Sequence, residues 1–550
     1  MTIGEKISRL RVRAHLSQET LAEKLDVSRQ SVSKWEMDQA TPQLEKIVAL
    51  CEMFVIPADD LIREDCEINF DSVKQKNPIN DTGENRYFGT DGFRGEANVD
   101  LTADHAYRVG RFLGWYFNVY ETNVRRPSER PRIVIGKDTR RSSYMLEYSI
   151  AAGITASGAD ACMMHVTTTP SVSYVTRMDG FDCGVMITAS HNPFQDNGIK
   201  VLNRYGEKMD DNVTRMIEKY IDGDLAALDV TEADLPFAHR DNIGCIEDYV
   251  AGRNRYIGYL ISVAAHSYRH LKIGLDCANG SSWMIAKSVF DALGAETYLR
   301  GNVPDGTNVN RDCGSTHIEG LCAFVREKHL DVGFAFDGDA DRCIAVDENG
   351  TTVDGDGILY VLAKRLKEKG ALDGNTVVAT VMSNSGLHRA LNRVGIGYEL
   401  TTVGDRFVYE CMEQNGYRLG GEQSGHIILR KYATTGDGIL TAIMLTEEMC
   451  DRKAPLSALT AGLTLYPQLT KNVYVKDKEA TVTDVEVQKK LKEIKGELAG
   501  NGRILLRVSG TEPVVRIMAE FAEEFGVPLV KSEEATSYVI SSLNAYLNRE

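Results

Sequence analysis

The chain has 550 residues, of which 43% are hydrophobic and 26% charged, a composition typical of a globular protein with about three to five domains. Its net charge of −16 excludes a protein that binds nucleic acid through overall positive charge, although a small DNA-reading module is still allowed. The N-terminus has no apolar signal-peptide core, and no apolar run approaches the ~20 residues of a membrane span. The 11 cysteines form no CxxC pair. We therefore expect a cytoplasmic protein with reduced cysteines and no membrane contact.

The first 62 residues are predicted to form a small helical domain. Apolar residues recur at helical spacing between residues 3 and 61, and Leu16–Glu36 contains a helix at Gln18–Leu25, a connection at 26–28 and a second helix from Arg29. This order is typical of a helix-turn-helix, with a generic helical bundle as the alternative. The exposed face of the second helix would carry side chains that suit base edges and phosphates, namely Arg29, Gln30, Ser33 and Lys34.

The run SRQSVSKWE at Ser28–Glu36 resembles the Cro/repressor-type (XRE-like) helix-turn-helix family. The resemblance implies DNA binding by a homodimer, with Gln18 added to the contacts of the second helix. The charges of this region nearly balance, so non-specific attraction to phosphates would be modest. Residues 63–85 are polar and contain Pro78 and Gly83, which predicts a flexible linker.

From residue 86 onward, short β-rich runs alternate with helical stretches. The runs RIVIGKD, KIGLDCANG, VGFAFDGD and VVATVMSNSG are each apolar and each break into polar residues. This alternation predicts parallel or mixed sheets with helices on their faces. Because sites in such sheets lie beyond the carboxyl ends of strands, we expect several of these strand-end loops to face one cleft.

Two of the polar clusters contain groups that suit phosphoryl transfer. Ser190 follows the buried run at Gly184–Ala189, a position compatible with either a turn residue or a nucleophile. DGDADR, at Asp337–Arg342, places three carboxylates at alternating positions, where they can converge on a hard cation such as Mg²⁺. An EF-hand is excluded because Arg342 stands where that loop needs Gly and because the flanks read as strands; a solvated acidic loop is the other alternative.

Two further clusters have the chemistry of a sugar phosphate site. In GGEQSGH, at Gly420–His426, Glu422 and Ser424 suit sugar hydroxyl or amino groups, although a tight turn would also explain the glycines. The run RVSGTEPVVR differs from a Walker A loop but offers phosphate donors, namely Ser509, Gly510 and Thr511 between Arg507 and Arg516. The four clusters together indicate phosphoryl transfer on a phosphosugar. In an extended segment His191 would point away from Ser190, so it is poorly placed as a direct base.

Residues 86–550 resemble the α-D-phosphohexomutase superfamily and, within it, the bacterial phosphoglucosamine mutases. The matching motifs are YFGTDGFRG, TASHNPFQDNGIKV, DGDADR, GEQSGH and RVSGTEP, and the subfamily rests on Gln423 and on PDGTNVNRDCGSTH, ATVMSNSGL and TTGDG. The resemblance implies a multidomain fold in which a small all-α domain (1–62) and the linker precede three related α/β domains and a C-terminal α+β domain. These are domain I (86–240), domain II (241–350), domain III (351–461) and domain IV (462–550).

The resemblance also implies a mechanism. Ser190 would carry a phosphoryl group, and Asp337, Asp339, Asp341 and that phosphate would hold Mg²⁺. A hexose 1,6-bisphosphate would prime the serine, and glucosamine 6-phosphate and 1-phosphate would interconvert through a 1,6-bisphosphate, for UDP-N-acetylglucosamine and cell-wall precursor synthesis. Arg94, His191 and Lys200 would serve proton transfer or charge stabilisation. The implied substrate-binding residues are Arg342, Glu422, Ser424, His426, Arg507, Ser509, Gly510, Thr511 and Arg516.

Two other functions are compatible with parts of this pattern. One is a phosphomannomutase/phosphoglucomutase, whose members more often have Met where Gln423 stands. The other is a transcription regulator that uses a mutase body to sense sugar phosphates without catalysis. A sensor could lose Ser190 or an aspartate and still bind its ligand, whereas every catalytic cluster is intact here, so the sequence favours an enzyme.

Overall fold

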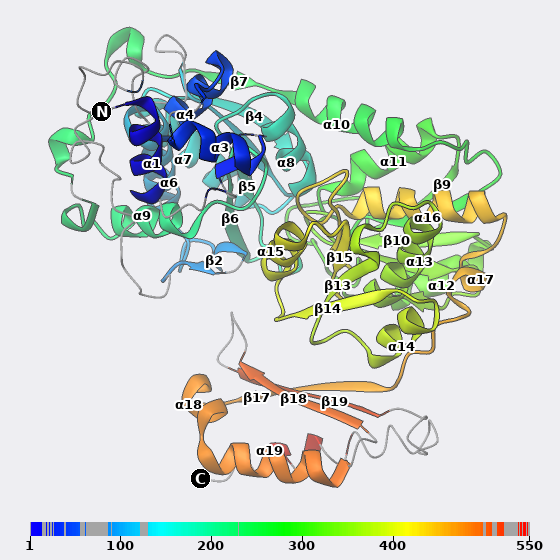
Figure 1. The fold of residues 1–550 in the computed structure, drawn as a ribbon. Helices are drawn as coiled ribbons and strands as arrows, with labels where there is room; N and C mark the ends of the chain where they lie inside the picture. Colours follow the sequence, from blue (N-terminus) through cyan, green and yellow to red (C-terminus); the bar gives the residue numbers. More distant parts are fainter. Residues whose placement is uncertain are drawn as a thin grey trace. The chain divides into compact units, whose positions relative to one another are not determined.

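A computed structural model of the chain describes residues 2–13, 18, 21–22, 25, 27–37, 40–54, 61, 86–89, 91–120, 130–228, 230–498, 502–508 and 514–521, with scattered positions between 537 and 547. The chain divides into two compact units, Met1–Glu84 with Tyr116–Arg130, and Asn85–Trp115 with Pro131–Glu550 (Figure 1). The predicted linker at 63–85 lies outside the described residues. Among those residues, no helix has the length and apolar character that crossing a membrane requires.

The first unit is a small helical domain. It contains α1 (Ile3–Arg13), α3 (Arg29–Glu36), α4 (Leu44–Phe54) and the π-helical turn η1 (Tyr116–Tyr120). Helix α3 begins at Arg29, as the sequence predicts, because the Ser28 hydroxyl accepts the N–H of Ser31 at 3.2 Å and caps it. Val32 and Trp35 of α3 are buried in a core with Ile7, Leu10, Leu21, Leu25 and Leu50. Helix α3 therefore starts where the sequence places the second helix of the pair, while part of the helix predicted at Gln18–Leu25 lies outside the described residues.

Domain I is built on a seven-stranded mixed sheet of order β1-β2-β6-β5-β3-β4-β7. The strands are β1 (Phe88–Gly89), β2 (Gly92–Glu96), β3 (Arg132–Lys137), β4 (Asp160–Val166), β5 (Cys183–Ile187), β6 (Asp196–Leu202) and β7 (Ile246–Asp248). Its helices are α6 (Ala103–Trp115), α7 (Ser143–Ala156), α8 (Thr169–Met178) and α9 (Asp211–Ile221). Strand β3 runs parallel to β4 and β5, so the loops that follow β3 and β5 emerge at one edge.

Domains II and III each contain a smaller sheet. The order in domain II is β12 (Thr352–Val353), β11 (Cys343–Asp347), β10 (Val332–Phe336), β8 (Lys272–Asp276) and β9 (Glu296–Arg300), with α10 (Val250–Val263), α11 (Ser282–Ala292) and α12 (Glu319–Lys328). The order in domain III is β14 (Gly397–Thr401), β13 (Thr376–Thr380), β15 (Leu419–Gly421) and β16 (Ile427–Leu429). The helices of domain III are α13 (Gly355–Glu368), α14 (Ser385–Arg393), α15 (Asp405–Asn415), α16 (Gly438–Arg452) and α17 (Leu456–Thr460).

A single hydrophobic core spans domains II and III. It includes Phe334 of β10, Leu359 of α13 and Ile443 of α16. Such a continuous core couples the two domains more tightly than separate cores would. Short 3-10 turns occur at Ala226–Leu228, Glu232–Asp234, Arg240–Asn242 and Asp373–Asn375.

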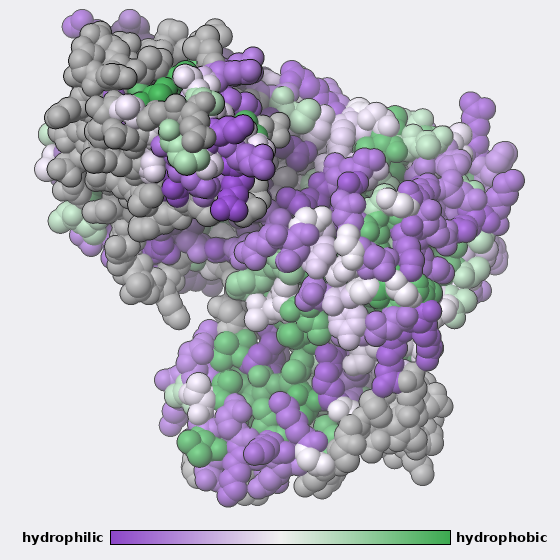
Figure 2. All heavy atoms as spheres, in the orientation of Figure 1, coloured by the Kyte–Doolittle hydropathy of each residue, from purple (hydrophilic) through white to green (hydrophobic). Residues whose placement is uncertain are grey.

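Domain IV is a three-stranded antiparallel sheet, β17 (Gln468–Tyr474), β19 (Val514–Phe521) and β18 (Gly502–Val508), with α18 (Lys478–Thr483) and α19 (Val485–Leu498). Figure 2 shows hydrophobic residues on its visible face, and Tyr474 and Val485 are exposed. The domain contacts domain III through Arg503, which donates to the carbonyl oxygens of Val381 (2.9 Å) and Ser383 (2.8 Å).

Candidate functional site

Ser190 lies in a strained turn directly after the buried strand β5. Its φ of 51° is in the left-handed region, which a non-glycine residue adopts only where the surroundings enforce it. The N–H of Ser190 donates to the hydroxyl of Thr188 at 2.9 Å, and that hydroxyl donates to Asp138 at 2.9 Å. The turn is thus attached to the end of β3 as well as to β5.

A buried ion pair that the sequence did not single out holds this turn. Arg140 and Asp138 are both fully buried and lie 2.8 Å apart. The guanidinium also donates to the carbonyl oxygens of Ser190 (3.0 Å), Asn192 (2.8 Å) and Asp196 (3.0 Å). The fork geometry of Arg allows one side chain to bind several acceptors of one loop. The polar run that follows β3 was the signal that could have identified Asp138 and Arg140.

The loop between β10 and β11 brings three carboxylates to Ser190. Ligand atoms of Asp337, Asp339 and Asp341 all lie within 4.8 Å of one another, and all three residues are buried. The Ser190 hydroxyl donates to Asp337 Oδ2 at 2.5 Å. The two loops meet so closely that a Cβ on Gly338 would lie 2.5 Å from the carbonyl oxygen of Ser190. Strands flank the loop on both sides, which agrees with the exclusion of an EF-hand.

The carboxylate cluster has the properties of a cation site. Burial, followed by the negative charges of Asp341 and Asp339, raises the pKa of Asp337 well above its ordinary value. Asp339 Oδ1 and Asp341 Oδ1 are buried without a hydrogen-bond partner among the described residues. Buried acceptors without partners and mutually repelling carboxylates are both relieved by a bound cation, and oxygen-only ligands suit Mg²⁺. The residues present therefore fit the metal that the sequence predicts.

Lys200 compensates part of this negative charge. Its ammonium lies 2.9 Å from Asp339 and 3.0 Å from Asp341, and the side chain is only 5% exposed. Burial opposes the charged form, but Asp339, Asp341 and Asp91 together raise the pKa of Lys200 well above its ordinary value. Lys200 is therefore a permanent cation beside the cluster, at the end of β6.

The other two residues predicted for proton transfer or charge stabilisation lie nearby. Arg94 forms an ion pair with Asp91 and donates to Asn192 Oδ1 at 3.2 Å. Burial, together with the positive charges of Arg342 and Arg94, lowers the pKa of His191 to about 3, so its imidazole is neutral near pH 7. Among the described residues no hydrogen bond joins His191 to Ser190, in line with the expectation that it is not a direct base for the serine.

The GEQSGH loop connects β15 to β16. Its His426 reaches the loop between β10 and β11 that carries Asp337, Asp339 and Asp341, which we call the metal loop. His426 Nδ1 lies 3.7 Å from Asp341 and Nε2 lies 3.6 Å from Asp405. Burial opposes protonation, but these carboxylates raise the pKa of His426 to about 9. The N–H of Gly436 also points at Nε2 (3.0 Å), a contact that favours the neutral ring. The two carboxylates and the amide N–H therefore act on the protonation of the ring in opposite directions.

The other predicted substrate residues of this loop differ in exposure. Glu422 accepts the N–H of Gly404 at 2.9 Å, and Ser424 is exposed. Arg342 follows the metal loop, where burial opposes but the carboxylates of Asp337, Asp341 and Glu422 raise the pKa of its guanidinium. The sugar loop and the metal loop therefore share one charged environment.

In domain IV two arginines lie directly opposite each other. Arg507 of β18 pairs with Arg516 of β19 in the antiparallel register. Burial and the charge of Arg516 lower the pKa of Arg507, while Glu422 has the opposite effect. Like charges in opposed positions destabilise a sheet, and an anion bound between the two arginines would relieve that repulsion. Ser509, Gly510 and Thr511 lie outside the described residues.

In the helical unit, the residues predicted to contact DNA lie on two parts of the surface. Arg29, Gln30 and Lys34 are exposed on α3, and Ser33 is half-buried. Gln18 donates its amide to Glu36 Oε2 at 2.7 Å, and Arg11 donates to the same oxygen at 3.0 Å. Gln18 therefore connects α3 to the rest of the domain, whereas Arg29, Gln30 and Lys34 of α3 are exposed to solvent.

Comparisons with known families agree with this arrangement. Models described as phosphoglucomutase/phosphomannomutase domains I, II, III and the C-terminal domain match residues 85–227, 252–350, 354–466 and 471–535, and a helix-turn-helix model matches residues 7–61. A phosphoglucosamine mutase from Lachnospira eligens is 59% identical over 435 residues, which are 79% of this chain and 94% of that protein. The chain belongs to the phosphoglucosamine mutase family. It is thus an isomerase of the phosphohexomutase type with a helix-turn-helix domain at its N-terminus.

Solved structures show the same fold for the mutase part. A phosphoglucomutase/phosphomannomutase family protein from Burkholderia thailandensis has a TM-score of 0.65 at 23% identity, covering 84% of this chain and 98% of its own. Aspergillus fumigatus N-acetylphosphoglucosamine mutase, in complex with glucose 1,6-bisphosphate, has a TM-score of 0.57 at 16% identity and covers 84% of this chain and 96% of its own. The mutase part of this chain therefore has the fold of these two proteins.

Proposed function

We propose that this chain interconverts glucosamine 6-phosphate and glucosamine 1-phosphate through a phosphorylated Ser190 and a 1,6-bisphosphate. The observation that supports this most strongly is the buried hydrogen bond from the Ser190 hydroxyl to Asp337, in a carboxylate cluster with the chemistry of a cation site. The product would supply UDP-N-acetylglucosamine and cell-wall precursor synthesis in the cytoplasm. We place the domain boundaries near residues 240, 350 and 461, and since β7 joins the domain I sheet and β12 the domain II sheet, the first two boundaries fall a few residues later than the sequence predicts.

In the proposed reaction Ser190 carries and returns one phosphoryl group. The 1-hydroxyl of glucosamine 6-phosphate attacks the phosphorus on Ser190, the bond from phosphorus to the serine oxygen breaks, and the 1,6-bisphosphate forms. After the bisphosphate reorients in the site, the Ser190 oxygen attacks the phosphorus of the 6-phosphate, the bond from that phosphorus to the sugar 6-oxygen breaks, the 6-oxygen takes up a proton, and glucosamine 1-phosphate is released. Arg140 keeps the serine at one point in space throughout, because it binds the carbonyl oxygens of the turn.

Asp337, Asp339 and Asp341, with the phosphate on Ser190, would hold Mg²⁺. When bound, this metal would neutralise part of the negative charge on the transferred phosphoryl group. Lys200 and Arg94 are cations and would stabilise charge. His191 is neutral, and a phosphoryl group on the neighbouring Ser190 would raise its affinity for the proton that the sugar hydroxyl loses.

The substrate would be bound at its two ends by different domains. Arg507 and Arg516, with Ser509, Gly510 and Thr511, would bind the phosphate that is not reacting, and Glu422, Ser424, His426 and Arg342 would bind the sugar. Since one phosphate loop must serve two orientations of the sugar, domain IV is expected to close after each is bound.

The test is turnover of the purified full chain. With Mg²⁺ and a glucose 1,6-bisphosphate primer, we expect glucosamine 6-phosphate to be converted, and faster than glucose 6-phosphate or mannose 6-phosphate. Glucose 1,6-bisphosphate is a reasonable primer because a solved structure of the same fold binds it. Absence of turnover, with Ser190 shown to be phosphorylated, would favour the sugar-phosphate sensor; faster turnover of the other hexoses would favour a phosphomannomutase/phosphoglucomutase.

We further propose that the N-terminal domain binds DNA as a homodimer. The exposed Arg29, Gln30 and Lys34 on a helix that Ser28 caps support this. Footprinting of the region upstream of the gene, with and without glucosamine 6-phosphate, tests both DNA binding and its response to the sugar. A protein that leaves no footprint and no shift on that DNA contradicts the proposal.

A further inference from the structure

Six ionisable side chains form a closed ring that includes the metal loop. Going round, carboxylates alternate with basic groups, and the members come from domains I, II and III. They are Asp341, Lys200, Asp91, Lys208, Asp405 and His426. Asp341 is the one ring member among the proposed metal ligands, and Lys200 and His426 are its neighbours in the ring.

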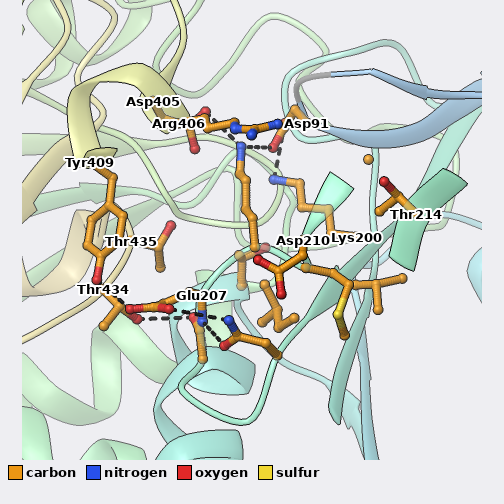
Figure 3. Close-up of a pocket in the computed structure, with 18 of the residues that line it drawn as sticks. Asp91, Lys200, Glu207, Asp210, Thr214, Asp405, Arg406, Tyr409, Thr434 and Thr435 are labelled. Carbon is orange, nitrogen blue, oxygen red and sulfur yellow. Dashed lines mark hydrogen bonds and ion pairs between the residues drawn. The ribbon is translucent and has the colours of Figure 1, made fainter. Parts of the chain in front are cut away.

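One arc of the ring joins domain I to domain III. Lys208 Nζ lies 3.2 Å from Asp91 Oδ1 and 2.7 Å from Asp405 Oδ1. Asp91 Oδ2 lies 3.3 Å from Lys200 Nζ, so Asp91 joins the two lysines through its two oxygens. Figure 3 shows Asp91, Lys200 and Asp405 pointing toward one another from the two domains, with dashed lines along this arc.

The other arc joins domain III to the metal loop. Asp405, the first residue of α15, lies 3.6 Å from His426 Nε2, and His426 Nδ1 lies 3.7 Å from Asp341 Oδ1. The side chains of His426 and Asp341 are 4% and 5% exposed. Interactions between charges this well shielded from water are strong, so each member restrains its two neighbours.

Among the described residues, the ion pairs of Lys208 and Asp405 are with Asp91, with His426 and with each other. Lys208 follows β6 in domain I, and Asp405 begins α15 in domain III; both line a cavity of about 210 Å³ between these domains. Their side chains are 29% and 15% exposed. Partly buried charges are costly to maintain unless they are paired, and the partners of these two are Asp91 and His426. What the pair holds in place is thus the two basic groups that touch Asp341.

We propose that Lys208 and Asp405 are positioning residues for the mutase reaction. Through Asp91 they fix Lys200, and through His426 they fix the opposite side of Asp341, so that the metal loop is complete only when domains I and III are both seated against domain II. This proposal rests on the function proposed above. The residues act through Lys200 and His426, so their loss affects the chemical step more than substrate binding.

The first test uses two near-isosteric variants, Lys208→Met and Asp405→Asn. We expect kcat for glucosamine 6-phosphate to fall on the order of 10²-fold in each, the size of effect that a misplaced catalytic group produces, with KM little changed. Asp211→Asn is the matched control, because the ion pair of Asp211 with Arg406 also joins domains I and III but lies outside the ring. Its kcat should equal that of the wild type.

The second test exchanges the two charges in the double variant K208D/D405K. The pair across the domains is then restored, but Asp at 208 faces Asp91 and Lys at 405 faces His426. We expect no recovery of kcat, because Asp at 208 repels Asp91, which then no longer holds Lys200 in place. Recovery would show that the pair only ties two domains together, and it would overturn the proposal.

Thermal unfolding of each variant shows that the measured protein is folded. Single variants that fold and retain the kcat of the wild type would also overturn the proposal. A wild-type protein that does not convert glucosamine 6-phosphate at all would instead refute the proposed function, so the two failures are distinguishable.

Discussion

The turn that carries Ser190 and the helix α3 both present polar side chains that the sequence marks as functional, but their surroundings differ. Ser190 is 1% exposed and Asp337 and Arg140 are fully buried, whereas Arg29, Gln30 and Lys34 of α3 are exposed. A polar group is costly to bury without hydrogen-bond partners, so the contacts of a buried polar group indicate the function of its site. An exposed polar group needs none, so its function must be tested against a ligand.

Removing the Ser190 hydroxyl should produce the largest effect. In Ser190→Ala we expect turnover of glucosamine 6-phosphate to fall by at least about 10³-fold, because no other group can carry the phosphoryl group at that point. The fold should persist, since the hydroxyl has one protein partner, Asp337. Coupled-assay kinetics and circular dichroism measure the two quantities. Substantial turnover in a folded Ser190→Ala protein would exclude the phosphoserine mechanism.

The carboxylate cluster should be nearly as sensitive. Chelation of divalent metal should abolish turnover of the wild-type protein, and Mg²⁺ should restore it, because the metal supplies several kcal/mol of charge stabilisation. Asp339→Asn should lower turnover on the order of 10³-fold and shift the Mg²⁺ titration to higher concentration. Full activity after chelation would contradict the assignment of Asp337, Asp339 and Asp341 as metal ligands.

Arg140 should show its effect mainly in stability. Arg140→Met leaves Asp138 buried without a cation and removes the donors to the Ser190 turn, so we expect a loss of about 3–5 kcal/mol in the free energy of unfolding. Lys287→Met is the control, because its pair with Asp291 is exposed and should contribute at most about 0.5 kcal/mol. Urea unfolding measures both. An equal loss in the free energy of unfolding in the two variants would show that the buried ion pair stabilises the fold no more than the exposed one.

The strands, the turn at Ser190 and the loop between β10 and β11 were predictable because each depends on a short local stretch of sequence. An apolar run that breaks into polar residues marks β5, β10 and β13, and Ser28 before a periodic run marks the start of α3. Spacing alone also places the aspartates at Asp337–Asp341 on one loop.

The buried ion pair of Asp138 with Arg140 and the ring of six side chains could not be predicted, because they depend on contacts between distant segments. Arg140, paired with Asp138, donates to backbone carbonyl oxygens of another loop, and acceptors of that kind leave no trace in residue type. Lys208 and Asp405 lie in different domains, and each alone reads as an ordinary surface charge. The core shared by domains II and III is likewise a property of packing, since periodicity assigns each helix to a sheet but not to a neighbouring domain.

The smallest effect should come from α3. If the helical unit binds DNA, Arg29→Ala and Lys34→Ala should each weaken binding by about 1 kcal/mol or more, and each residue that contacts a phosphate should lower the slope of log affinity against log salt by about 1. Neither change should alter mutase turnover, since the two side chains lie in the separate first unit. Gln18→Ala should instead reduce the stability of the unit, because its amide is bound to Glu36. Fluorescence anisotropy at several salt concentrations, combined with thermal unfolding, separates these cases. Affinity that is unchanged in both α3 variants would mean that α3 does not contact the DNA, however closely its residues suit the groove.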